Sequence, residues 1–136
     1  DAGAHVGTIC DASYPTYLLT HWGRDRTRGE KIPLEFLVNK QTRRTAEAYG
    51  LLDRGLLRPG YKADFNIVDF ERLTVGQPEL VRDLPAGGKR LVQRPTGYSH
   101  TFVSGTEVSC EGEVTGQRPG RLVRGAQSDP GCLSDE

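Results

Sequence analysis

The apolar residues in the first third of the chain recur at helical spacing. Leu18 and Trp22 lie four positions apart and define one apolar stripe. Asp11 or Ser13, just before this stripe, can accept a hydrogen bond from a first-turn amide and so cap the helix. We expect the helix to end near Gly23, because glycine readily adopts the backbone conformation of a helix terminus.

A second helix is predicted after a polar, basic stretch. Leu34, Leu37 and Val38 fall on one helical face, and Pro33 suits the first turn because that turn needs no amide donor. Gly50 is a natural carboxyl-terminal cap. We therefore expect one helix that opens at Pro33 and stops at Gly50.

The pattern changes from helical to alternating after residue 54. Residues 58–61, Arg-Pro-Gly-Tyr, place proline and glycine at the two central positions of a type II turn, with a positive φ expected at Gly60. Beyond this turn Ala63, Phe65 and Ile67 alternate with polar residues. Such alternation is typical of a strand with one buried face.

A hairpin is predicted over the segments 98–103 and 106–110. Ser104-Gly105 between them is compatible with a tight turn of two residues. The prolines, charges and paired glycines of 71–95 instead predict a long irregular connection with one short strand at 90–93. Helices followed by antiparallel strands place the chain in the α+β fold class.

Composition narrows the range of partners. The 18 Lys and Arg balance the 18 Asp and Glu, so the chain has no net field to attract nucleic acid. No apolar run approaches the ~20 residues that span a bilayer, so we expect no membrane partner. Cys10, Cys110 and Cys132 lack the paired spacing of a zinc or redox centre. Free thiols in a reducing compartment predict a cytoplasmic location.

Several polar residues have plain structural interpretations. Asp64 and Asp69 flank the strand and are expected to bond backbone amides at its ends. His100 has no acid or second histidine beside it in the sequence, so metal binding is not expected there. Cys10 has no sequence-positioned histidine to activate it as a nucleophile. The arginines of 24–28 are interpreted as a solvated run, with binding of a substrate carboxylate as the alternative.

One group of motifs resembles a known family. Residues 55–64, Gly-Leu-Leu-Arg-Pro-Gly-Tyr-Lys-Ala-Asp, resemble the G-x-L-x-x-G-x-x-A-D segment through which metal-dependent amidohydrolases pass from their catalytic barrel into a small β-sandwich. Residues 1–5, Asp-Ala-Gly-Ala-His, resemble the Ser-Asp-Gly-Gly-x-His loop after the last barrel strand. Residues 83–88 and 115–121 add further matches. Together these motifs are similar to the carboxyl-terminal part of N-acyl-D-amino-acid deacylases, also called D-aminoacylases.

The resemblance implies an organisation in three segments. Residues 1–54 would form a loop and helices at the end of a metal-dependent hydrolase (β/α)8, or TIM, barrel, 55–125 a β-sandwich segment, and 126–136 a flexible tail. A barrel needs ~250 residues, so a chain of 136 residues cannot close one. The chain is therefore expected to be an inactive portion of a longer enzyme.

The resemblance also implies a chemistry. The parent enzyme would use zinc to hydrolyse the amide bond of small-molecule N-acyl-D-amino acids, with its other metal ligands upstream and no zinc bound by this chain alone. Asp1 would take the proton of the attacking water and pass it to the leaving amine, and a role as metal ligand stays open. In the isolated chain Asp1 is alternatively an exposed terminal acid. His5 either lines the substrate pocket or contacts Asp1, and the alternative is a loop histidine bonded to backbone.

A second class of function stays open. The sequence after Gly55 shows no reactive cluster, which also suits a non-catalytic β-rich module for packing or oligomerisation. In an isolated chain, Phe65, Ile67, Phe102 and Val103 would lack part of their cover. Open strand edges and uncovered apolar residues favour either self-association or repacking of the helices onto the sheet.

Overall fold

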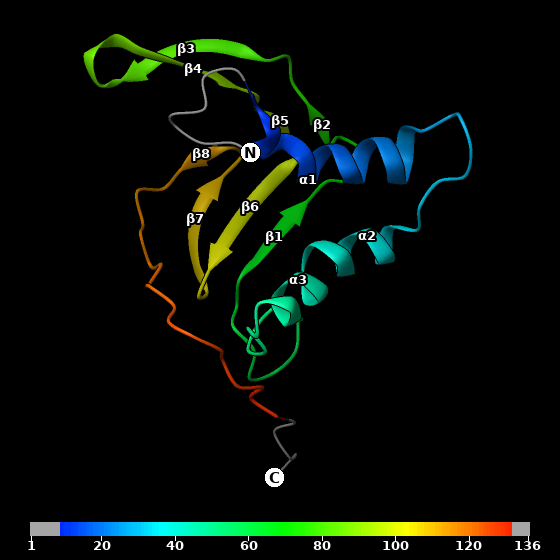
Figure 1. The fold of residues 1–136 in the computed structure, drawn as a ribbon, viewed down its shortest axis with the longest axis vertical. Coiled ribbons are helices and arrows are strands. Elements are labelled where there is room, and N and C mark those ends of the chain that lie inside the picture. Colours follow the sequence, from blue (N-terminus) through cyan, green and yellow to red (C-terminus); the bar gives the residue numbers. More distant parts are fainter. Residues whose placement is uncertain (1–8, 132–136) are drawn as a thin grey trace. The chain divides into compact units, whose positions relative to one another are not determined.

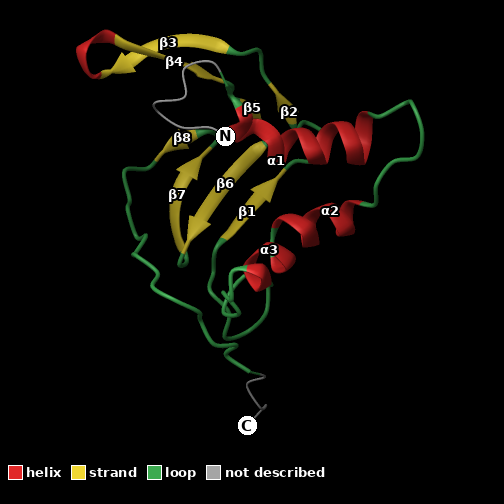
Figure 2. Ribbon diagram, viewed as in Figure 1, coloured by secondary structure: helices red, strands yellow, loops and turns green. Residues whose placement is uncertain are grey.

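The computed structural model describes residues 9–131, which fold into two compact units (Figure 1). Unit 1 comprises Asp1–Lys31 and Asp69–Gly97, and unit 2 comprises Ile32–Val68 and Tyr98–Glu136. Helices and antiparallel strands occur together, as Figure 2 shows, which confirms the predicted α+β class. No helix among the described residues is both long and apolar enough to cross a bilayer.

Unit 1 begins with one continuous helical stretch made of three parts. The 3-10 turn η1 (Asp11–Ser13) leads into α1 (Tyr14–Tyr17) and then into the π-helical segment η2 (Leu18–Asp25). The predicted helix is thus confirmed, and it ends two residues beyond Gly23. Ser13 does not supply the predicted side-chain cap, because its hydroxyl lies 3.1 Å from the Cys10 carbonyl and 2.6 Å from Gln93 Oε1 instead of bonding a first-turn amide.

The rest of unit 1 consists of short antiparallel pairs. Strand β2 (Thr74–Val75) pairs with β5 (Pro95–Thr96), and β3 (Glu79–Leu84) pairs with β4 (Gly88–Val92) around the turn η3 (Pro85–Gly87). The prediction of an irregular connection is therefore wrong over most of its length. In the turn, Ala86 and Gly87 both adopt positive φ, which reverses the chain between β3 and β4.

Leu73 is the fully buried side chain of unit 1, with none of its surface exposed. The backbone at Gly97 passes directly over it: a Cβ atom added to Gly97 would lie 2.6 Å from Leu73 Cα. Gly97 also has a φ of +98°. Glycine is therefore required here twice, for its conformation and for the close approach of two backbone segments.

The helices of unit 2 form a broken pair. Helix α2 (Leu34–Gln41) and helix α3 (Arg43–Ala48) meet at Thr42, whose φ of −117° and ψ of −91° interrupt the predicted single helix. The Thr42 hydroxyl donates a hydrogen bond of 2.8 Å to the Val38 carbonyl, a contact that commonly bends helices. Of the predicted apolar face only Leu37 is buried, while Leu34 and Val38 are exposed. Gly50 follows the pair with a φ of +68°, as a cap requires.

The main sheet of unit 2 is antiparallel with strand order β1-β6-β7-β8 (Figure 1). Its strands are β1 (Phe65–Val68), β6 (Tyr98–Val103), β7 (Thr106–Cys110) and β8 (Glu113–Val114). The predicted hairpin is confirmed: Val103 pairs with Thr106, and Ser104 and Gly105 between them both have positive φ. Two positive φ angles define the type I′ turn, whose twist matches that of paired strands.

The predicted buried face of β1 is wrong. Ala63 is exposed and 48% of Ile67 is open to solvent, although Phe65 stacks on Phe102 with ring centroids 4.7 Å apart. Apolar and polar residues do alternate over residues 63–67, but within unit 2 few side chains cover the face of the sheet that carries Ile67.

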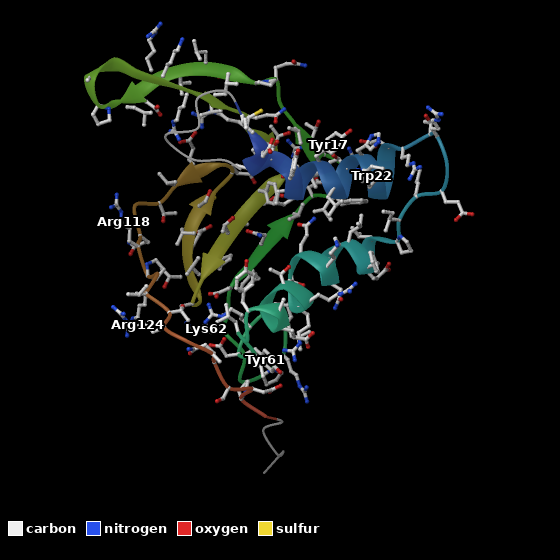
Figure 3. The ribbon with its side chains drawn as sticks, viewed as in Figure 1. Tyr17, Trp22, Tyr61, Lys62, Arg118 and Arg124 are labelled. Atoms are coloured by element: carbon white, nitrogen blue, oxygen red, sulfur yellow. The ribbon has the colours of Figure 1, made fainter. Side chains whose placement is uncertain are left out.

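Residues 127–129 follow β8 in the chain and form hydrogen bonds with earlier residues of unit 2. Gln127 donates to the Gly50 carbonyl at 2.8 Å and accepts from the Leu52 amide at 3.0 Å. The Tyr61 hydroxyl, near the labelled Lys62 in Figure 3, donates to Asp129 at 2.9 Å. The start of the predicted tail is thus held by hydrogen bonds and not by apolar packing, and the three predicted segment boundaries stay predictions.

The turn before β1 yields a stability prediction. The Tyr61 amide donates to the Arg58 carbonyl at 3.1 Å and Gly60 has a φ of +87°, which confirms the type II turn. Gly60→Val should lower the free energy of unfolding by about 1–3 kcal/mol, because a β-branched residue resists positive φ. Lys62→Ala in the same turn keeps the backbone bonds and should be near neutral. Thermal denaturation of both variants is the measurement, and equal shifts would contradict the turn assignment.

Candidate functional site

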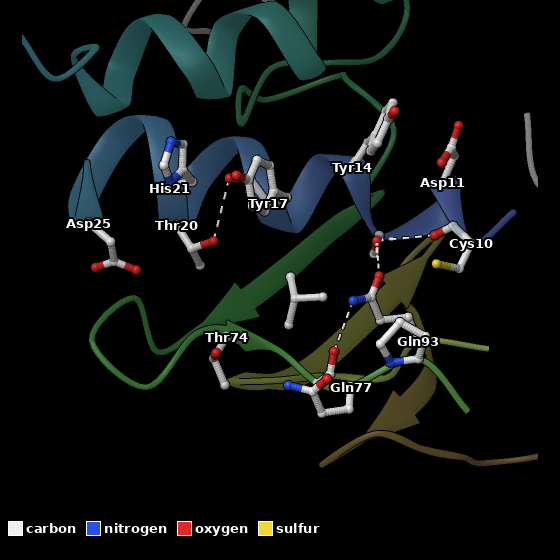
Figure 4. Close-up of a pocket in the computed structure, with 14 residues that line it drawn as sticks. Cys10, Asp11, Tyr14, Tyr17, Thr20, His21, Asp25, Thr74, Gln77 and Gln93 are labelled. Atoms are coloured by element: carbon white, nitrogen blue, oxygen red, sulfur yellow. Dashed lines mark hydrogen bonds between the residues drawn. The ribbon is translucent and has the colours of Figure 1, made fainter. Parts of the chain in front are cut away.

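The two residues predicted to act in catalysis or substrate binding, Asp1 and His5, lie outside the described residues. The structure therefore describes only the region that follows them in the chain. That region forms the wall of a hollow of about 460 Å³ in unit 1 (Figure 4).

The hollow lies between the helical stretch and the strand segment around β2. Tyr14, Tyr17 and His21 line it from the helical side, and Thr74 and Gln77 line it from the strand side. The rings of Tyr17 and His21 stack with centroids 5.0 Å apart, which fixes the imidazole against the helix. The walls thus offer aromatic surface with hydroxyl and amide groups among it, a lining that suits a small organic molecule.

Buried hydroxyl groups hold this wall together. Ser13 and Thr20 are more than nine-tenths buried. Thr20 donates to the Thr16 carbonyl at 3.1 Å, while Ser13 contacts Gln93, whose amide donates to the Gly76 carbonyl at 2.9 Å. Gln93 therefore connects the helical stretch to the strand segment through two hydrogen bonds. Figure 4 marks the two hydrogen bonds of Gln93 as dashed lines.

Cys10 also lines this hollow and a second one of about 350 Å³. Its thiol is free. His21 lies at the other end of the hollow from Cys10 (Figure 4), eleven positions further along the helical stretch. Among the described residues, His21 is therefore not placed to activate Cys10 as a nucleophile.

In the basic run of residues 24–28, Arg24 and Arg26 contact other protein groups whereas Arg28 is exposed, so the interpretation as a solvated run is correct only in part. The Arg24 guanidinium donates to both Asp25 carboxylate oxygens, at 2.7 and 2.9 Å, and to the Phe70 and Glu71 carbonyls. The hydrogen bond from Arg24 holds the pKa of the Asp25 carboxyl below its usual value. Arg26 lies over the Trp22 ring at 4.6 Å. The contacts of Arg24 occupy the donors with which its guanidinium would bind a substrate carboxylate.

The motif of residues 55–64 has a structural role in the described fold. Asp64 accepts a hydrogen bond of 2.7 Å from the Ser104 amide, and Asp69 accepts one of 3.1 Å from the Arg72 amide, as predicted. Gly55 has a φ of +84°, and a Cβ atom there would lie 2.9 Å from Arg43 Cα. The motif thus positions the entry to β1 against α3 and the hairpin, and it presents no reactive group.

His100 does have an acid beside it, contrary to the sequence prediction. Its Nδ1 atom lies 2.5 Å from Glu107 Oε1 on the neighbouring strand, and Cys110 lies close to both. Partial removal from solvent raises the pKa of the Cys110 thiol, and the charges of Glu107 and Glu111 raise it further. Sequence reasoning missed this cluster, because the tight turn at Ser104-Gly105 alone would place His100 opposite Ser109, and a shift of register between Thr101 and Phe102 places it opposite Cys110 instead.

The residues described here do not assemble the catalytic zinc centre that the resemblance implies. Among positions 9–131, the three side chains of ligand type that gather within 4.8 Å are His100, Glu107 and Cys110, all on β6 and β7. The resemblance instead assigns the catalytic ligands to segments upstream of Asp1.

Comparison with known proteins identifies the family. The model of the amidohydrolase family matches residues 1–109, and the chain therefore belongs to that family. It is 35% identical over 106 residues to a D-aminoacylase from Alcaligenes xylosoxydans xylosoxydans, covering 78% of this chain and 19% of that relative. An N-acyl-D-aspartate deacylase from the same organism is also 35% identical over 106 residues, covering 77% of this chain and 19% of the relative.

A shorter segment of the chain is similar to an enzyme with a different activity. An adenine deaminase from Lysinibacillus sphaericus (strain C3-41) is 68% identical over 32 residues, which cover 24% of this chain and 6% of the relative. No solved structure matches the chain significantly. The chain spans about a fifth of the length of the two deacylases, so the activity of a whole protein is a matter for proposal.

Proposed function

We propose that this chain is the carboxyl-terminal part of a longer zinc-dependent amidohydrolase that cleaves the amide bond of N-acyl-D-amino acids, releasing a carboxylate and a D-amino acid. The observation that carries the proposal is the 35% identity to a D-aminoacylase over 106 residues. The second deacylase, matched over the same length, supports the same substrate class. A (β/α)8 barrel and a small β-sandwich in the longer protein belong to this proposal.

Asp1 is the residue we propose as the proton carrier. Its carboxylate would accept a proton from the attacking water and then donate it to the nitrogen of the leaving amine, because cleavage of an amide requires both transfers. Zinc, when bound, would supply the Lewis acid that polarises the amide carbonyl. His5, four residues further on, would line the substrate pocket.

The isolated chain is expected to be inactive toward N-acetyl-D-methionine. Asp1 alone offers no preorganised pocket, and the electrostatic stabilisation of the transition state depends on groups that surround the substrate. Release of D-methionine is measured with zinc added, for the isolated chain and for the longer protein in parallel. Turnover by the isolated chain above a buffer blank, abolished by Asp1→Ala, would contradict this part of the proposal.

The coding sequence upstream of Asp1 separates the enzyme from a non-catalytic module. The enzyme requires an upstream strand that ends in His-x-His, since paired histidines supply metal ligands at the mouth of a barrel. A start codon directly before Asp1 would instead favour the module for packing or oligomerisation. Among the described residues after Gly55, the side chains of ligand type that gather in one place are those of the His100 cluster.

We propose that the isolated chain self-associates through β1, which is an edge strand of the main sheet and carries an exposed apolar side chain. Ile67 is 48% exposed on an edge strand, and edge strands with apolar side chains readily pair with other chains. Light scattering over a range of concentrations should show association that Ile67→Lys weakens. Leu80→Lys, which changes an exposed leucine on β3 of unit 1, is the matched control and should leave association unchanged. A monomer at all concentrations would refute this proposal.

A cytoplasmic location completes the proposal. Both cysteines among the described residues, Cys10 and Cys110, are free thiols, as a reducing compartment would allow. The equal numbers of acidic and basic residues give no reason to add nucleic acid as a partner.

A further inference from the structure

Three side chains with different ligand chemistry meet on one face of the β6–β7 hairpin. The imidazole of His100 projects from β6, while the carboxylate of Glu107 and the thiol of Cys110 project from β7. One ligand atom from each residue lies within 4.8 Å of the others. The two strands run side by side in Figure 1.

A β-bulge creates this juxtaposition. His100 pairs with Cys110 and Thr101 with Ser109, but Phe102 pairs with Glu107, so Val108 is the extra residue in β7. In a regular strand Glu107 and Cys110 would point to opposite faces, because side chains alternate. The extra residue turns Glu107 to the face of Cys110, and bulges are known to re-aim side chains in this way.

The neighbouring residues confirm which face carries the cluster. Thr101, between His100 and Phe102 on β6, points to the opposite face and donates a hydrogen bond of 2.8 Å to Asn66. The His100 and Phe102 rings lie on the same face, with centroids 6.2 Å apart. The imidazole is therefore backed by an aromatic ring on one side and by the Glu107 carboxylate on the other.

We propose that His100, Glu107 and Cys110 form a binding site for a divalent transition metal of the zinc and cobalt class. Nitrogen, oxygen and sulfur ligands together suit these borderline-soft ions, whereas magnesium and calcium require oxygen ligands. A thiolate and a carboxylate carry two negative charges, which balance the charge of a divalent cation. Three protein ligands leave one position of a tetrahedral site for water.

The distance between His100 and Glu107 requires little change to accommodate the ion, and the ligand atoms of all three residues lie within 4.8 Å of one another. Ligand atoms at zinc bond lengths of about 2.0–2.3 Å lie roughly 3.4 Å apart in a tetrahedral site. His100 Nδ1 and Glu107 Oε1, now 2.5 Å apart, need to separate by less than one bond length to bind the same ion. The side chains of His100 and Glu107 are 38% and 36% exposed, so an ion can reach them from solvent.

This proposal does not rest on the proposed function. The catalytic ligands of the proposal lie upstream of Asp1, whereas His100, Glu107 and Cys110 all belong to one hairpin of unit 2. The hairpin can therefore be tested with the 136-residue chain itself, whatever the activity of a longer protein proves to be.

Cobalt(II) titration of a C10S/C132S variant tests the proposal, because Cys110 is then the remaining thiol of the three in the sequence. A sulfur-to-cobalt charge-transfer band in the near ultraviolet should appear at one equivalent, and zinc should displace it while magnesium should not. Adding Cys110→Ser should abolish the band. Adding His100→Gln or Glu107→Gln should weaken cobalt binding by at least about tenfold, as losses of metal-site residues generally do.

A matched control uses the histidine that stacks on Tyr17 in unit 1. His21→Gln in the same background should leave the cobalt affinity unchanged. Far-ultraviolet circular dichroism of every variant shows whether the hairpin still folds. A folded His100→Gln variant that binds cobalt as tightly as its parent would overturn the proposal, because the thiol would then bind without its partners. Absence of the band in the folded C10S/C132S protein would overturn it equally.

Discussion

Asp1→Ala in the longer protein is expected to lower kcat for N-acetyl-D-methionine by about 10²–10⁴-fold, the usual contribution of a positioned acid–base group. The proposed role of Asp1 is to take a proton from water and return it to the leaving nitrogen. Alanine can do neither, and water in its place lacks the fixed position that makes proton transfer efficient. KM should change much less, since the carboxylate acts on the reacting atoms.

The zinc content of the same variant decides between two roles for Asp1. Unchanged zinc with lost turnover supports the proton carrier, whereas loss of zinc together with turnover would assign Asp1 as a metal ligand. Asp11→Ala is the matched control, because it removes an acid ten positions further along, in η1, and should leave kcat near the parental value. Parental turnover in Asp1→Ala would remove Asp1 from the mechanism altogether.

Gly97→Val is expected to produce the largest loss of stability of any single substitution proposed for this chain. Valine at a φ of +98° is strained, and its Cβ would lie 2.6 Å from Leu73 Cα and 2.8 Å from Leu73 N. Both atoms belong to backbone, so no side-chain rotation can relieve the overlap. Strain and overpacking together should lower the free energy of unfolding by about 3–5 kcal/mol.

Gly112→Val separates the two contributions. Gly112 has a φ of +84°, close to that of Gly97, but nothing lies within 4 Å of an added Cβ atom. Its cost should be the conformational strain alone, about 1–2 kcal/mol. Chemical denaturation of the two variants gives the comparison. Equal losses would show that the backbone at Leu73 does not approach Gly97 as closely as described.

The features that the sequence predicted well are those encoded by a few adjacent residues. Pro59-Gly60 determines a type II turn through the φ preferences of two residues, and Ser104-Gly105 does the same for the hairpin. Asp64 and Asp69 follow the general tendency of short acids to bond nearby amides at strand ends. In each case the chemistry is local, so tertiary packing had little opportunity to change the result.

The features that the sequence did not predict depend on the register between paired strands or on whether residues distant in the chain cover a side chain. The cluster at His100 requires the bulge at Val108, and no pattern of apolar residues announces a bulge. Ile67 alternates as a buried residue does, but burial depends on a second layer that the alternation itself cannot supply. Strand β3 was not predicted because Arg82 and Asp83 interrupt its apolar pattern. The segment nevertheless forms a strand, because it pairs with β4.

The location of the candidate catalytic residues could be predicted only through resemblance. Asp1 and His5 stand out because of a family pattern, and they lie outside the described residues. Within unit 1 the hollow beside Tyr17 and His21 comes from helix and strand segments some 50 residues apart in the chain, a distance over which sequence patterns carry no contact information.

The central claim is that this chain is part of a deacylase of N-acyl-D-amino acids, and enantiomer preference tests it most directly. The purified longer protein is supplied separately with N-acetyl-D-methionine, N-acetyl-L-methionine and adenine, and release of amine or ammonia is measured. The claim predicts turnover of the D-substrate in clear excess over the other two. Deamination of adenine, or preference for the L-substrate, would contradict it.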